Sequence, residues 1–308
     1  MTAPARPLVV LVPHRDGPEL LGDVPAVEPV PYEPNAPLPD AAATAPVLIP
    51  PLAPTDTAAL MKAMPRLELV QLLSAGAEIW TGKVPRAVQL SDCRGAHGAA
   101  TADWVLAALL ATWRNIPHFM RDQLQGRWSP SPVDDLDGKR VLILGAGDIA
   151  SHVARRLAAF EVTTTMVGRT PRPGVHGVEE VHRLLPAHDA CVVVVPLTDA
   201  TRGLVDAGFL SAMPRGAVLV NAGRGAVVNT GALVAELSSG RLRAALDVTD
   251  PEPLPPEHPL WRAPGLLLTP HIGSNTPGAL VRAYRVAAEQ IALFGAGRPL
   301  TNLVHDGY

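Results

Sequence analysis

The sequence predicts an α/β protein that contains a doubly wound parallel sheet of the Rossmann type and a second, smaller α/β domain. Its 308 residues suffice for two domains, since a domain usually holds about 100 to 200 residues. From residue 141 onward, short apolar runs typical of buried strands alternate with segments of helical periodicity, the pattern of a parallel sheet with crossover helices. A glycine-rich turn, Gly145 to Ala150, lies between the first of these strands and its helix.

The first 92 residues contain short strand candidates separated by many prolines. Apolar runs at Leu8–Val12, Val47–Ile49 and Leu67–Leu73 predict strands. Proline fixes φ and has no amide hydrogen. The proline-rich stretch from Pro25 to Pro54 is therefore expected to form mostly loop or edge structure.

A long helical pattern follows, from about Ala99 to Gln125, and Pro117 is expected to kink it. Within this pattern the stretch from Trp104 to Ala111 is apolar on all sides. That stretch is far shorter than the roughly 20 residues that cross a membrane. We therefore expect it to be buried against protein.

The alternation that comes next predicts the larger sheet. Strands are expected at Val141–Leu144, Val162–Val167, Ala190–Val195, Ala217–Val220, Ala244–Leu246 and Leu266–Leu268. Helices are expected at Ile149–Phe160 and Val178–Leu185, between the first three of these strands. A last helix, about Pro277–Phe294, is expected to pack back onto the N-terminal domain.

Composition and charge argue against several classes of function. A formal net charge of -3 gives no broad basis for binding nucleic acid or an anionic membrane surface. The apolar run Leu8–Val12 is too short for a signal-peptide core. Cys93 and Cys191 match no metal or redox spacing, and we expect both to be buried thiols of a cytoplasmic protein. No metal site is predicted.

The turn between the first strand of the larger sheet and its helix predicts a dinucleotide site. Gly145 permits a tight turn, and Gly147 lets backbone amides approach a pyrophosphate. The small Ala150 fills the third position, where it allows close helix packing. Asp148 and Ile149 belong to the same cofactor-binding turn.

The residues after the second strand of this sheet favour NADP(H) over NAD(H). A site for NAD usually has a carboxylate there that bonds to the ribose 2′-hydroxyl, and the stretch from Val167 to Arg172 has none. Arg169, Thr170 and Arg172 could instead bind a 2′-phosphate through charge-assisted hydrogen bonds. Both arginines could equally be ordinary solvated loop residues, which a comparison of NADPH with NADH would decide.

Three polar strings each follow a predicted strand in the second half of the chain. They are Asn221–Gly225, Asp247–Pro253 and Thr269–Gly273. The carboxyl ends of parallel strands meet at one edge of a sheet, where ligands bind, so an arginine, a glutamate and a histidine are expected there. These groups are suited to binding a carboxylate and moving a proton beside it.

The order of these strings resembles the D-isomer-specific 2-hydroxyacid dehydrogenases, in particular the glyoxylate and hydroxypyruvate reductases. The resemblance includes Leu136–Lys139 and Val195–Thr198 and is strong from Gly95 to Thr276. It implies a flavodoxin-like substrate domain formed by residues 1–92 and 277–308, and a nucleotide-binding domain formed by residues 93–276. It further implies a homodimer joined by the long helix described above.

The resemblance also implies a role for each charged residue at the sheet edge. Arg224 would hold the carboxylate and the 2-oxo group of a small 2-oxo acid, and His271 would protonate the developing alkoxide. Glu252 would orient the imidazole and favour its protonated form. Asp250 is a competing partner for His271, but the family spacing from Asp247 favours Glu252. Asp247 itself would bond to the nicotinamide or its ribose.

Other residues gain roles through the same resemblance. Backbone amides of Ser74, Ala75 and Gly76 would face the substrate carboxylate, unless the segment is a plain turn. His97 is expected to be structural, whereas His118 is a candidate for reaching the partner subunit's site. The remaining cofactor positions implied are Pro196, Thr198, Ala222, Gly223 and Gly273.

Alternative functions remain open at this stage. Formate-oxidising relatives replace the acidic partner of the histidine with an amide, which Glu252 argues against. Phosphite-oxidising relatives keep a similar trio, so a substrate panel is needed to separate them. A nucleotide-sensing scaffold, like the corepressors related to this family, would bind NADPH without reducing 2-oxo acids. A short-chain dehydrogenase is disfavoured, because no tyrosine is followed four residues later by lysine.

Overall fold

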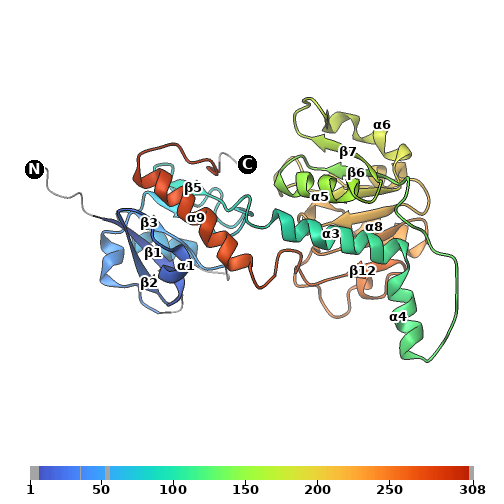
Figure 1. The fold of residues 1–308 in the computed structure, drawn as a ribbon, viewed down its shortest axis with the longest axis horizontal. Coiled ribbons are helices and arrows are strands. Elements are labelled where there is room, and N and C mark those ends of the chain that lie inside the picture. The colour runs from blue at the N-terminus through green and yellow to red at the C-terminus, as the bar shows by residue number, and fades with distance from the viewer. Residues whose placement is uncertain (1–6, 35, 53–55, 305–308) are drawn as a thin grey trace, which may run out of the picture. The chain divides into compact units, whose positions relative to one another are not determined.

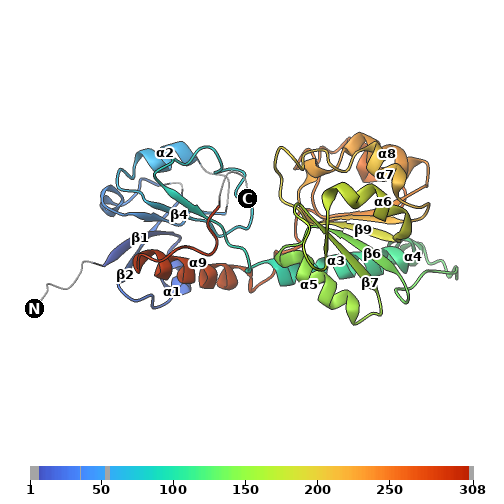
Figure 2. The same cartoon turned by 90° about the horizontal axis from the view of Figure 1, so that it is seen from above.

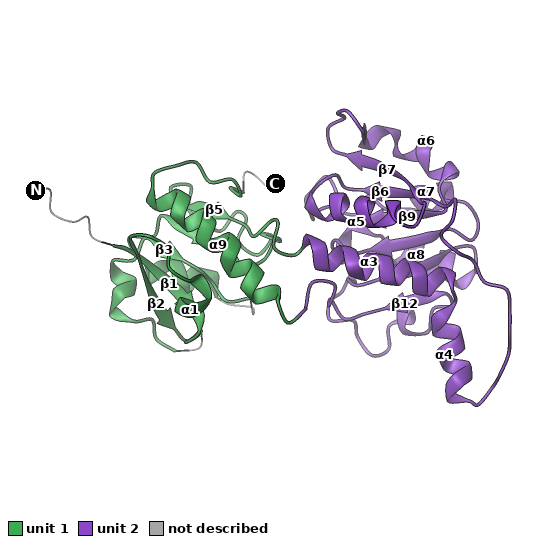
Figure 3. Cartoon of the chain, viewed as in Figure 1, with its two compact units in different colours: residues 1–97, 277–308 green, residues 98–276 purple. Residues whose placement is uncertain are grey.

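The computed structural model describes residues 7–34, 36–52 and 56–304, which form two compact units (Figure 1; Figure 3). The first unit contains Met1–His97 and Pro277–Tyr308, and the second contains Gly98–Thr276. Each unit is built around its own parallel sheet. The predicted α/β fold class is therefore confirmed.

The sheet of the first unit has five strands in the order β2-β1-β3-β4-β5, all parallel. Its strands are β1 (Leu8–Pro13), β2 (Val27–Tyr32), β3 (Val47–Leu48), β4 (Leu69–Gln71) and β5 (Gln89–Ser91). Its helices are α1 (Gly17–Leu21), α2 (Thr57–Lys62) and α9 (Ala279–Gly295), with a short 3-10 helix at Asp40–Ala43.

Apolar side chains alternate between the two faces of this smaller sheet. Val10 and Val12 belong to a core that contains Tyr284 and Ile291 of α9, whereas Leu11 belongs to the core on the opposite face. A period of two is what a strand buried on both faces requires. The C-terminal helix therefore packs onto the N-terminal part of the chain, as predicted.

The strand β2 shows how a proline-rich segment enters the sheet. It lies at the edge and pairs with β1. The carbonyls of Ala26 and Tyr32 accept hydrogen bonds from the β1 side, so alternation turns the backbone of Pro29 and Pro31 toward the open edge. No ladder bond is lost there. The prediction of loop or edge structure is confirmed for this strand, and residues 35 and 53–54 of the predicted stretch lie outside the described residues.

The sheet of the second unit has seven strands in the order β12-β11-β10-β9-β6-β7-β8, all parallel. Its strands are β6 (Arg140–Leu144), β7 (Thr163–Gly168), β8 (Val175–Gly177), β9 (Ala190–Val193), β10 (Val218–Asn221), β11 (Arg243–Leu246) and β12 (Leu266–Leu268). Its helices are α3 (Gly98–Trp113), α4 (Ile116–Leu124), α5 (Asp148–Ala158), α6 (Val181–Leu184), α7 (Ala207–Ala212) and α8 (Thr230–Ser238).

Helices cover both faces of the larger sheet, which is therefore doubly wound. Leu142 and Leu144 of β6 belong to a core shared with α6, α7 and α8. Val141 and Ile143 belong to a second core, shared with α3 and α5. Figure 2 shows these two groups of helices on opposite sides of the sheet. Burial on both faces explains why the central strands β6, β9 and β10 are almost continuously apolar in the sequence.

The long helix predicted from Ala99 to Gln125 is wrong in one respect, because the chain forms two helices rather than one kinked helix. α3 ends at Trp113, and Asn115 adopts a left-handed backbone conformation with a φ of 51°. Asparagine tolerates this conformation better than most residues do. Pro117 lies in the first turn of α4, where its missing amide hydrogen costs no helical bond.

Helix α3 buries one face and leaves the other partly exposed within a single chain. Val105, Leu109 and Trp113 are fully buried in the core that α3 shares with α5. Trp104 and Leu110 are only partly buried. Within one chain, the apolar stretch is therefore buried against protein on one of its faces, and its other face is partly exposed.

Both cysteines are buried free thiols. Burial raises the pKa of the Cys93 thiol to about 12, and burial also raises the pKa of the Cys191 thiol. Neither residue therefore forms an appreciable amount of thiolate, the nucleophilic species, at neutral pH.

No helix in the described part of the chain is both long and apolar enough to cross a membrane.

Candidate active site

Three neighbouring strands bring the polar strings to one edge of the larger sheet. β10 pairs with β11 and β11 pairs with β12, and the register places Asn221, Leu246 and Leu268 side by side. Because the strands are parallel, the segments that follow them begin at the same level of the carboxyl edge. The strings that contain the arginine, the glutamate and the histidine therefore start together.

A buried asparagine shapes the segment after β10. The side chain of Asn221 accepts a hydrogen bond from the Gly223 amide at 3.0 Å and donates one to the Arg224 carbonyl at 3.0 Å. The half-buried Arg224 guanidinium donates to the Gly223 carbonyl at 2.8 Å. A side chain at Gly225 would meet the carbonyl oxygen of Thr249 at 1.9 Å. The segments after β10 and β11 are therefore in direct contact.

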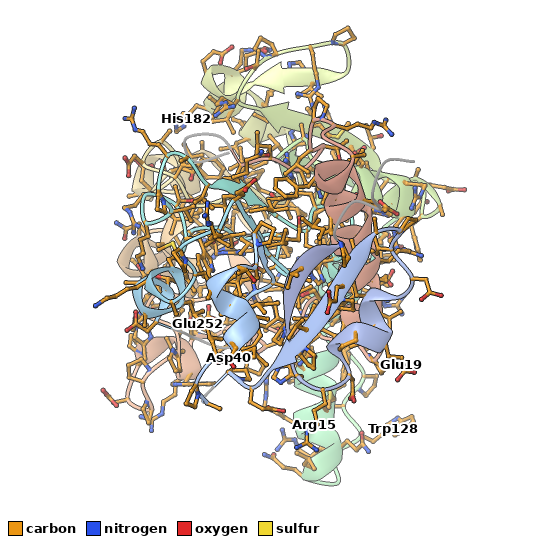
Figure 4. All side chains as sticks on the ribbon, turned by 90° about the vertical axis from the view of Figure 1, so that its left-hand side faces the viewer. Arg15, Glu19, Asp40, Trp128, His182 and Glu252 are labelled. Carbon is orange, nitrogen blue, oxygen red and sulfur yellow. The ribbon has the colours of Figure 1, made fainter. Side chains whose placement is uncertain are left out.

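The structure pairs His271 with Glu252. The Nδ1 atom of His271 lies 2.6 Å from Oε1 of Glu252, and the two side chains are 45% and 41% exposed. Glu252 is labelled in Figure 4. Of the two carboxylates that the sequence offers, Glu252 and Asp250, it is Glu252 that holds the imidazole. Contact at Nδ1 leaves Nε2 as the ring nitrogen that can serve another group.

Asp247 organises the segment that carries His271. Its carboxylate, 4% exposed, accepts hydrogen bonds from Thr269 Oγ1 at 2.6 Å, the Ile272 amide at 2.8 Å and the Gly273 amide at 2.7 Å. His271 has a φ of 53°, which is uncommon for a residue with a side chain. Its amide donates to the Asp247 carbonyl at 2.8 Å. Asp247 therefore holds the loop of His271 in place, a role that the sequence does not indicate.

The glycine turn before α5 is tightly packed at Gly145 and open at Gly147. Gly145 has a φ of 131°, which favours glycine, and a side chain there would meet the carbonyl oxygen of Val194 at 2.9 Å. A Cβ atom at Gly147 would meet no described atom within 4 Å, so the space beside this turn is open. Among the described residues, no side chain caps α5 at Gly147, and uncapped amides at a helix start suit an anion.

The side chains of Asp148 and Ile149 are engaged within the second unit. The Asp148 carboxylate lies 3.5 Å from Nε2 of His152, and a Cβ atom at Gly98 would meet that carboxylate at 1.9 Å. Ile149 packs against the core that α3 shares with α5. Any contribution of these two residues to a cofactor site would therefore come from their backbone amides.

The basic residues after β7 lie beside the glycine turn. Arg172 donates from Nη2 to the carbonyl of Ala146, within the turn, at 2.7 Å. Arg169 and Thr170 are exposed and follow β7 directly, and the neighbouring strand β6 leads into the same turn. No acid occurs between residues 168 and 172. The local charge is therefore positive where a carboxylate would favour NAD.

The other predicted cofactor positions lie in close-packed backbone. A Cβ atom at Gly223 would meet the carbonyl oxygen of Val195 at 2.7 Å, so the segments after β9 and β10 touch. Thr198 lies in a turn in which its Oγ1 is 3.1 Å from that of Thr201. Thr201 also donates to the Pro196 carbonyl at 2.7 Å. Two further predicted positions are buried: Ala222 and Gly273.

The predicted carboxylate-binding loop lies in the first unit, after β4. Ser74, Ala75 and Gly76 are all partly exposed. The Ser74 hydroxyl donates to the Gly76 carbonyl at 2.7 Å, which closes the loop. Nε2 of His97 lies 2.8 Å from the carbonyl oxygen of Leu73, just before the loop. This contact gives His97 a part in supporting the loop.

The ionisable side chains at α4 form local pairs. His118 has its Nε2 3.4 Å from Oδ2 of Asp122, on the same helix, and Arg127 pairs with that buried carboxylate. A role for His118 in a partner subunit's site stays a prediction. Across residues 7–34, 36–52 and 56–304, no three His, Cys, Asp or Glu side chains are grouped in a way that could hold a metal ion.

Sequence comparison relates the chain to known oxidoreductases. Residues 106–273 match the family model described as D-isomer specific 2-hydroxyacid dehydrogenase, NAD binding domain. A glyoxylate reductase of Aeropyrum pernix is 35% identical over 263 residues, which cover 80% of this chain and 78% of that protein. The segment that matches the family model includes every strand of the larger sheet and the loops that hold Arg224, Glu252 and His271.

Comparison with solved structures gives similar results. A D-isomer specific 2-hydroxyacid dehydrogenase from Xanthobacter autotrophicus Py2, solved in complex with NADPH and MES, is 30% identical with a TM-score of 0.84, covering 99% of this chain and 100% of that one. An NADPH-dependent glyoxylate/hydroxypyruvate reductase from Sinorhizobium meliloti, solved with citrate, is 28% identical with a TM-score of 0.79, covering 98% and 99% respectively.

Proposed function

The chain belongs to the D-isomer-specific 2-hydroxyacid dehydrogenase family, and from that premise we propose that its site reduces small 2-oxo acids to D-2-hydroxy acids with NADPH. The observation that carries the proposal is the 2.6 Å contact between His271 and Glu252, at the same sheet edge as the Arg224 segment. A proton donor and a guanidinium at one edge are the groups that reduction of a 2-oxo acid needs. Relatives named glyoxylate reductase and glyoxylate/hydroxypyruvate reductase support this chemistry.

His271 delivers the proton in the proposed reaction. The turn at Gly145 and Gly147 would hold a nicotinamide cofactor, which would supply the hydride for the 2-carbon of the substrate. As the 2-oxo oxygen gains negative charge, the protonated imidazole transfers a proton to it from Nε2. Glu252 holds Nδ1, which fixes the orientation of the ring before the transfer. In the direction of oxidation the neutral imidazole accepts the hydroxyl proton.

Arg224 binds the substrate in this scheme. Its planar guanidinium carries several donors in a fixed geometry and can bond to the carboxylate and the 2-oxo oxygen together, which a lysine cannot do equally well. Asn221 holds the backbone that presents it, through the two bonds to Gly223 and Arg224. In the first unit, the backbone amides of Ser74, Ala75 and Gly76 are the groups that we propose for binding a carboxylate.

The preferred cofactor in this proposal is NADP(H). The positive residues beside the glycine turn, Arg169 and Arg172, support it, as does the absence of acids between residues 168 and 172. The relative from Xanthobacter was solved in complex with NADPH, and the relative from Sinorhizobium is NADPH-dependent. A 2′-phosphate would gain charge-assisted bonds here, whereas a 2′-hydroxyl would find no carboxylate.

A panel of 2-oxo acids assayed with NADPH and with NADH tests function and cofactor together. We expect reduction with a higher kcat/KM for NADPH, because a charge-assisted bond is worth about 1.5 to 3 kcal/mol, or roughly 10- to 100-fold. Arg169→Asp should lower the NADPH value by about that factor and spare NADH. Arg66→Asp, a charge reversal at an exposed site in the other unit, is the control.

The outcomes of this panel are distinct. A clear NADH preference in the natural protein would contradict the cofactor assignment while leaving the reductase function standing. Tight NADPH binding without turnover of any 2-oxo acid would indicate a nucleotide-sensing scaffold. Oxidation of phosphite or formate, with no reduction of 2-oxo acids, would assign the site to one of those reactions.

We also propose that the protein acts as a homodimer. α3 leaves part of its apolar surface exposed, and α4 exposes Ile116, Met120 and Leu124, at 45%, 59% and 87%. A spacing of four residues places these three on one helix face. Trp128, shortly after α4, is 95% exposed (Figure 4). Clustered apolar exposure of this kind is typical of an interface.

Light scattering coupled to size-exclusion chromatography tests the dimer. The natural protein should have twice the mass of the chain, and Leu124→Glu should shift it toward the monomer, because a charge would be buried at the interface. Phe160→Glu introduces the same charge at another exposed apolar residue, 40% exposed after α5, and should remain dimeric. A natural protein that is monomeric at all concentrations would contradict the proposal.

A further inference from the structure

The segment that carries Glu252 lacks the backbone hydrogen bonds that usually hold a loop in place. It runs from Thr249 to Pro253, shortly after β11. No residue of this segment forms a backbone–backbone hydrogen bond with any other described residue. Pro251 and Pro253 have no amide hydrogen to donate. The position of the Glu252 backbone must therefore come from other contacts.

Two threonine hydroxyls bond to the backbone of this segment. Thr249 donates from Oγ1 to the carbonyl of Pro251 at 2.8 Å, a bond that stays within the segment. Thr230, the first residue of α8, donates from Oγ1 to the carbonyl of Asp250 at 3.0 Å. Among the described residues, this is the only hydrogen bond that ties the backbone of residues 249–253 to another element. Glu252 lies two residues further along the chain.

The hydroxyl of Thr230 is presented from a firmly held part of the fold. The preceding residue, Asn229, caps α8 by accepting a hydrogen bond from the Ala232 amide at 2.9 Å. The Asn229 amide donates to the Val205 carbonyl at 2.9 Å, and Val227 is fully buried in the core. Threonine is branched at Cβ, so its side chain has few rotamers. The hydroxyl can therefore hold a neighbouring loop in a defined place.

The same stretch of chain begins with Arg224. Residues 224–230 contact the glutamate segment at two points. A side chain at Gly225 would meet the carbonyl oxygen of Thr249 at 1.9 Å, and the Thr230 hydroxyl bonds to the next carbonyl, that of Asp250. These two contacts fix the segment after β11 relative to the segment after β10. The backbone that carries Glu252 is thereby placed with reference to the arginine.

We propose that Thr230 is a positioning residue, which acts through the Asp250 carbonyl to hold the Glu252 carboxylate against His271. This inference rests on the reductase function proposed above. The contact between Glu252 and Nδ1 of His271 is 2.6 Å long, and a hydrogen bond weakens steeply when its geometry is lost. Both side chains are half-exposed, so water takes the place of the carboxylate when the segment shifts. Thr230 thus affects proton transfer without contacting the substrate.

Replacing Thr230 with valine removes the hydroxyl and keeps the branched shape and a similar helix propensity. We expect kcat for glyoxylate to fall by about three- to tenfold, the range that one net hydrogen bond accounts for. KM for glyoxylate should not change, because Asn221 holds the Arg224 backbone independently of Thr230. Thr230→Ser retains the hydroxyl and should keep the natural kcat. The matched control is Thr44→Val, which removes a hydroxyl that donates to the Ala41 carbonyl in the other unit.

A double variant shows whether Thr230 acts through Glu252. Glu252→Ala removes the carboxylate that Thr230 is proposed to position. Adding Thr230→Val to this variant should lower kcat no further, because nothing is left to position. Independent effects on stability or on another residue would instead add as free energies in the double variant. The cycle therefore separates positioning of Glu252 from a purely structural role of Thr230.

Nitrogen NMR of ring-labelled histidine gives a test that needs no turnover. In a neutral imidazole, the hydrogen bond at one ring nitrogen decides which nitrogen carries the proton. In the natural protein Nδ1 of His271 should carry it, facing Glu252. Thr230→Val should move the chemical shift of this nitrogen toward its value in Glu252→Ala, and Thr230→Ser should not. His271→Asn assigns the signal by its absence.

Several results would overturn the inference. They are an unchanged kcat and Nδ1 shift in Thr230→Val, a rise of KM with kcat unchanged, and an equal loss of kcat in the natural and Glu252→Ala backgrounds. If the natural protein does not reduce glyoxylate or any other 2-oxo acid, the reductase function itself fails. The Nδ1 shift then still decides whether Thr230 positions Glu252, so the two failures are distinguishable.

Discussion

Replacing His271 with alanine is expected to lower kcat for the reduction of 2-oxo acids by roughly 10²- to 10⁴-fold, the range that loss of a general acid usually produces. The 2-oxo oxygen would then receive its proton from water. The side chain is 45% exposed and lies at the edge of the unit, so the loss concerns chemistry rather than folding. The measurement is steady-state kinetics at saturating NADPH, with thermal unfolding as a check on the fold.

Two further histidine variants sharpen this test. His271 occupies a left-handed backbone conformation, which asparagine tolerates well, so His271→Asn should show the same loss with the loop undisturbed. His176→Ala removes another half-exposed histidine that lies beside a carboxylate, Glu180, and should keep the natural kcat. A His271→Ala enzyme with near-natural turnover would exclude His271 as the acid.

The partner carboxylate is tested by its effect on the same kcat. The contact of 2.6 Å between Glu252 and Nδ1 of His271 fixes the orientation of the ring. Glu252→Gln should lower kcat by roughly tenfold, because a charge-assisted hydrogen bond becomes a neutral one, a difference of about 1 to 1.5 kcal/mol. Asp250→Asn is the matched control and should keep the natural kcat. The reverse pattern would make Asp250 the partner.

Replacing Arg224 with lysine is expected to lower kcat/KM for 2-oxo acids by roughly 10²-fold. Lysine keeps the charge but loses the planar pair of donors that can bond to two oxygens at once. Loss of one or two charge-assisted hydrogen bonds, each worth about 1.5 to 3 kcal/mol, accounts for this factor. KM should rise and kcat should fall, because the guanidinium is assigned to the 2-oxo oxygen as well as to the carboxylate.

Cofactor binding and a second arginine provide the controls for Arg224→Lys. The dissociation constant of NADPH, measured by fluorescence without substrate, should stay close to the natural value. Arg241→Lys alters an arginine that donates to the carbonyls of Leu210 and Met213 at the end of α7. That change should lower stability and leave KM unaffected. An Arg224→Lys enzyme with unchanged kcat/KM would remove Arg224 from the substrate site.

The larger sheet could be predicted well because its signal is local. β6, β9, β10 and β11 are short, mostly apolar runs buried on both faces. The signal is weaker toward one edge of the sheet, where β7 begins with three threonines and the short β8 is not among the predicted strands. The break between α3 and α4 could not be located in the same way. It depends on the backbone of Asn115 and on Pro117 as the second residue of a new helix, whereas a proline inside a helical pattern is equally compatible with a kink.

The residues of the candidate site could be predicted from the sequence, but the hydrogen bonds that hold them in place could not. The position of His271 after a strand follows from the sequence. The bonds that shape its loop come from Asp247, and those that shape the arginine segment come from Asn221. In the sequence Asp247 resembles a ligand-binding group and Asn221 gains no role, because a polar residue at a strand end has the same appearance whether its partners belong to a ligand or to the backbone.

The two prolines at the open side of β2 have a consequence for self-association. A free sheet edge can act as a template on which a strand of another molecule adds, and continued addition leads to fibres. At Pro29 and Pro31 the outward-facing positions offer no amide hydrogen, so an incoming strand would leave its carbonyls unsatisfied there. Addition of a strand from another molecule is therefore disfavoured on this side of the smaller sheet.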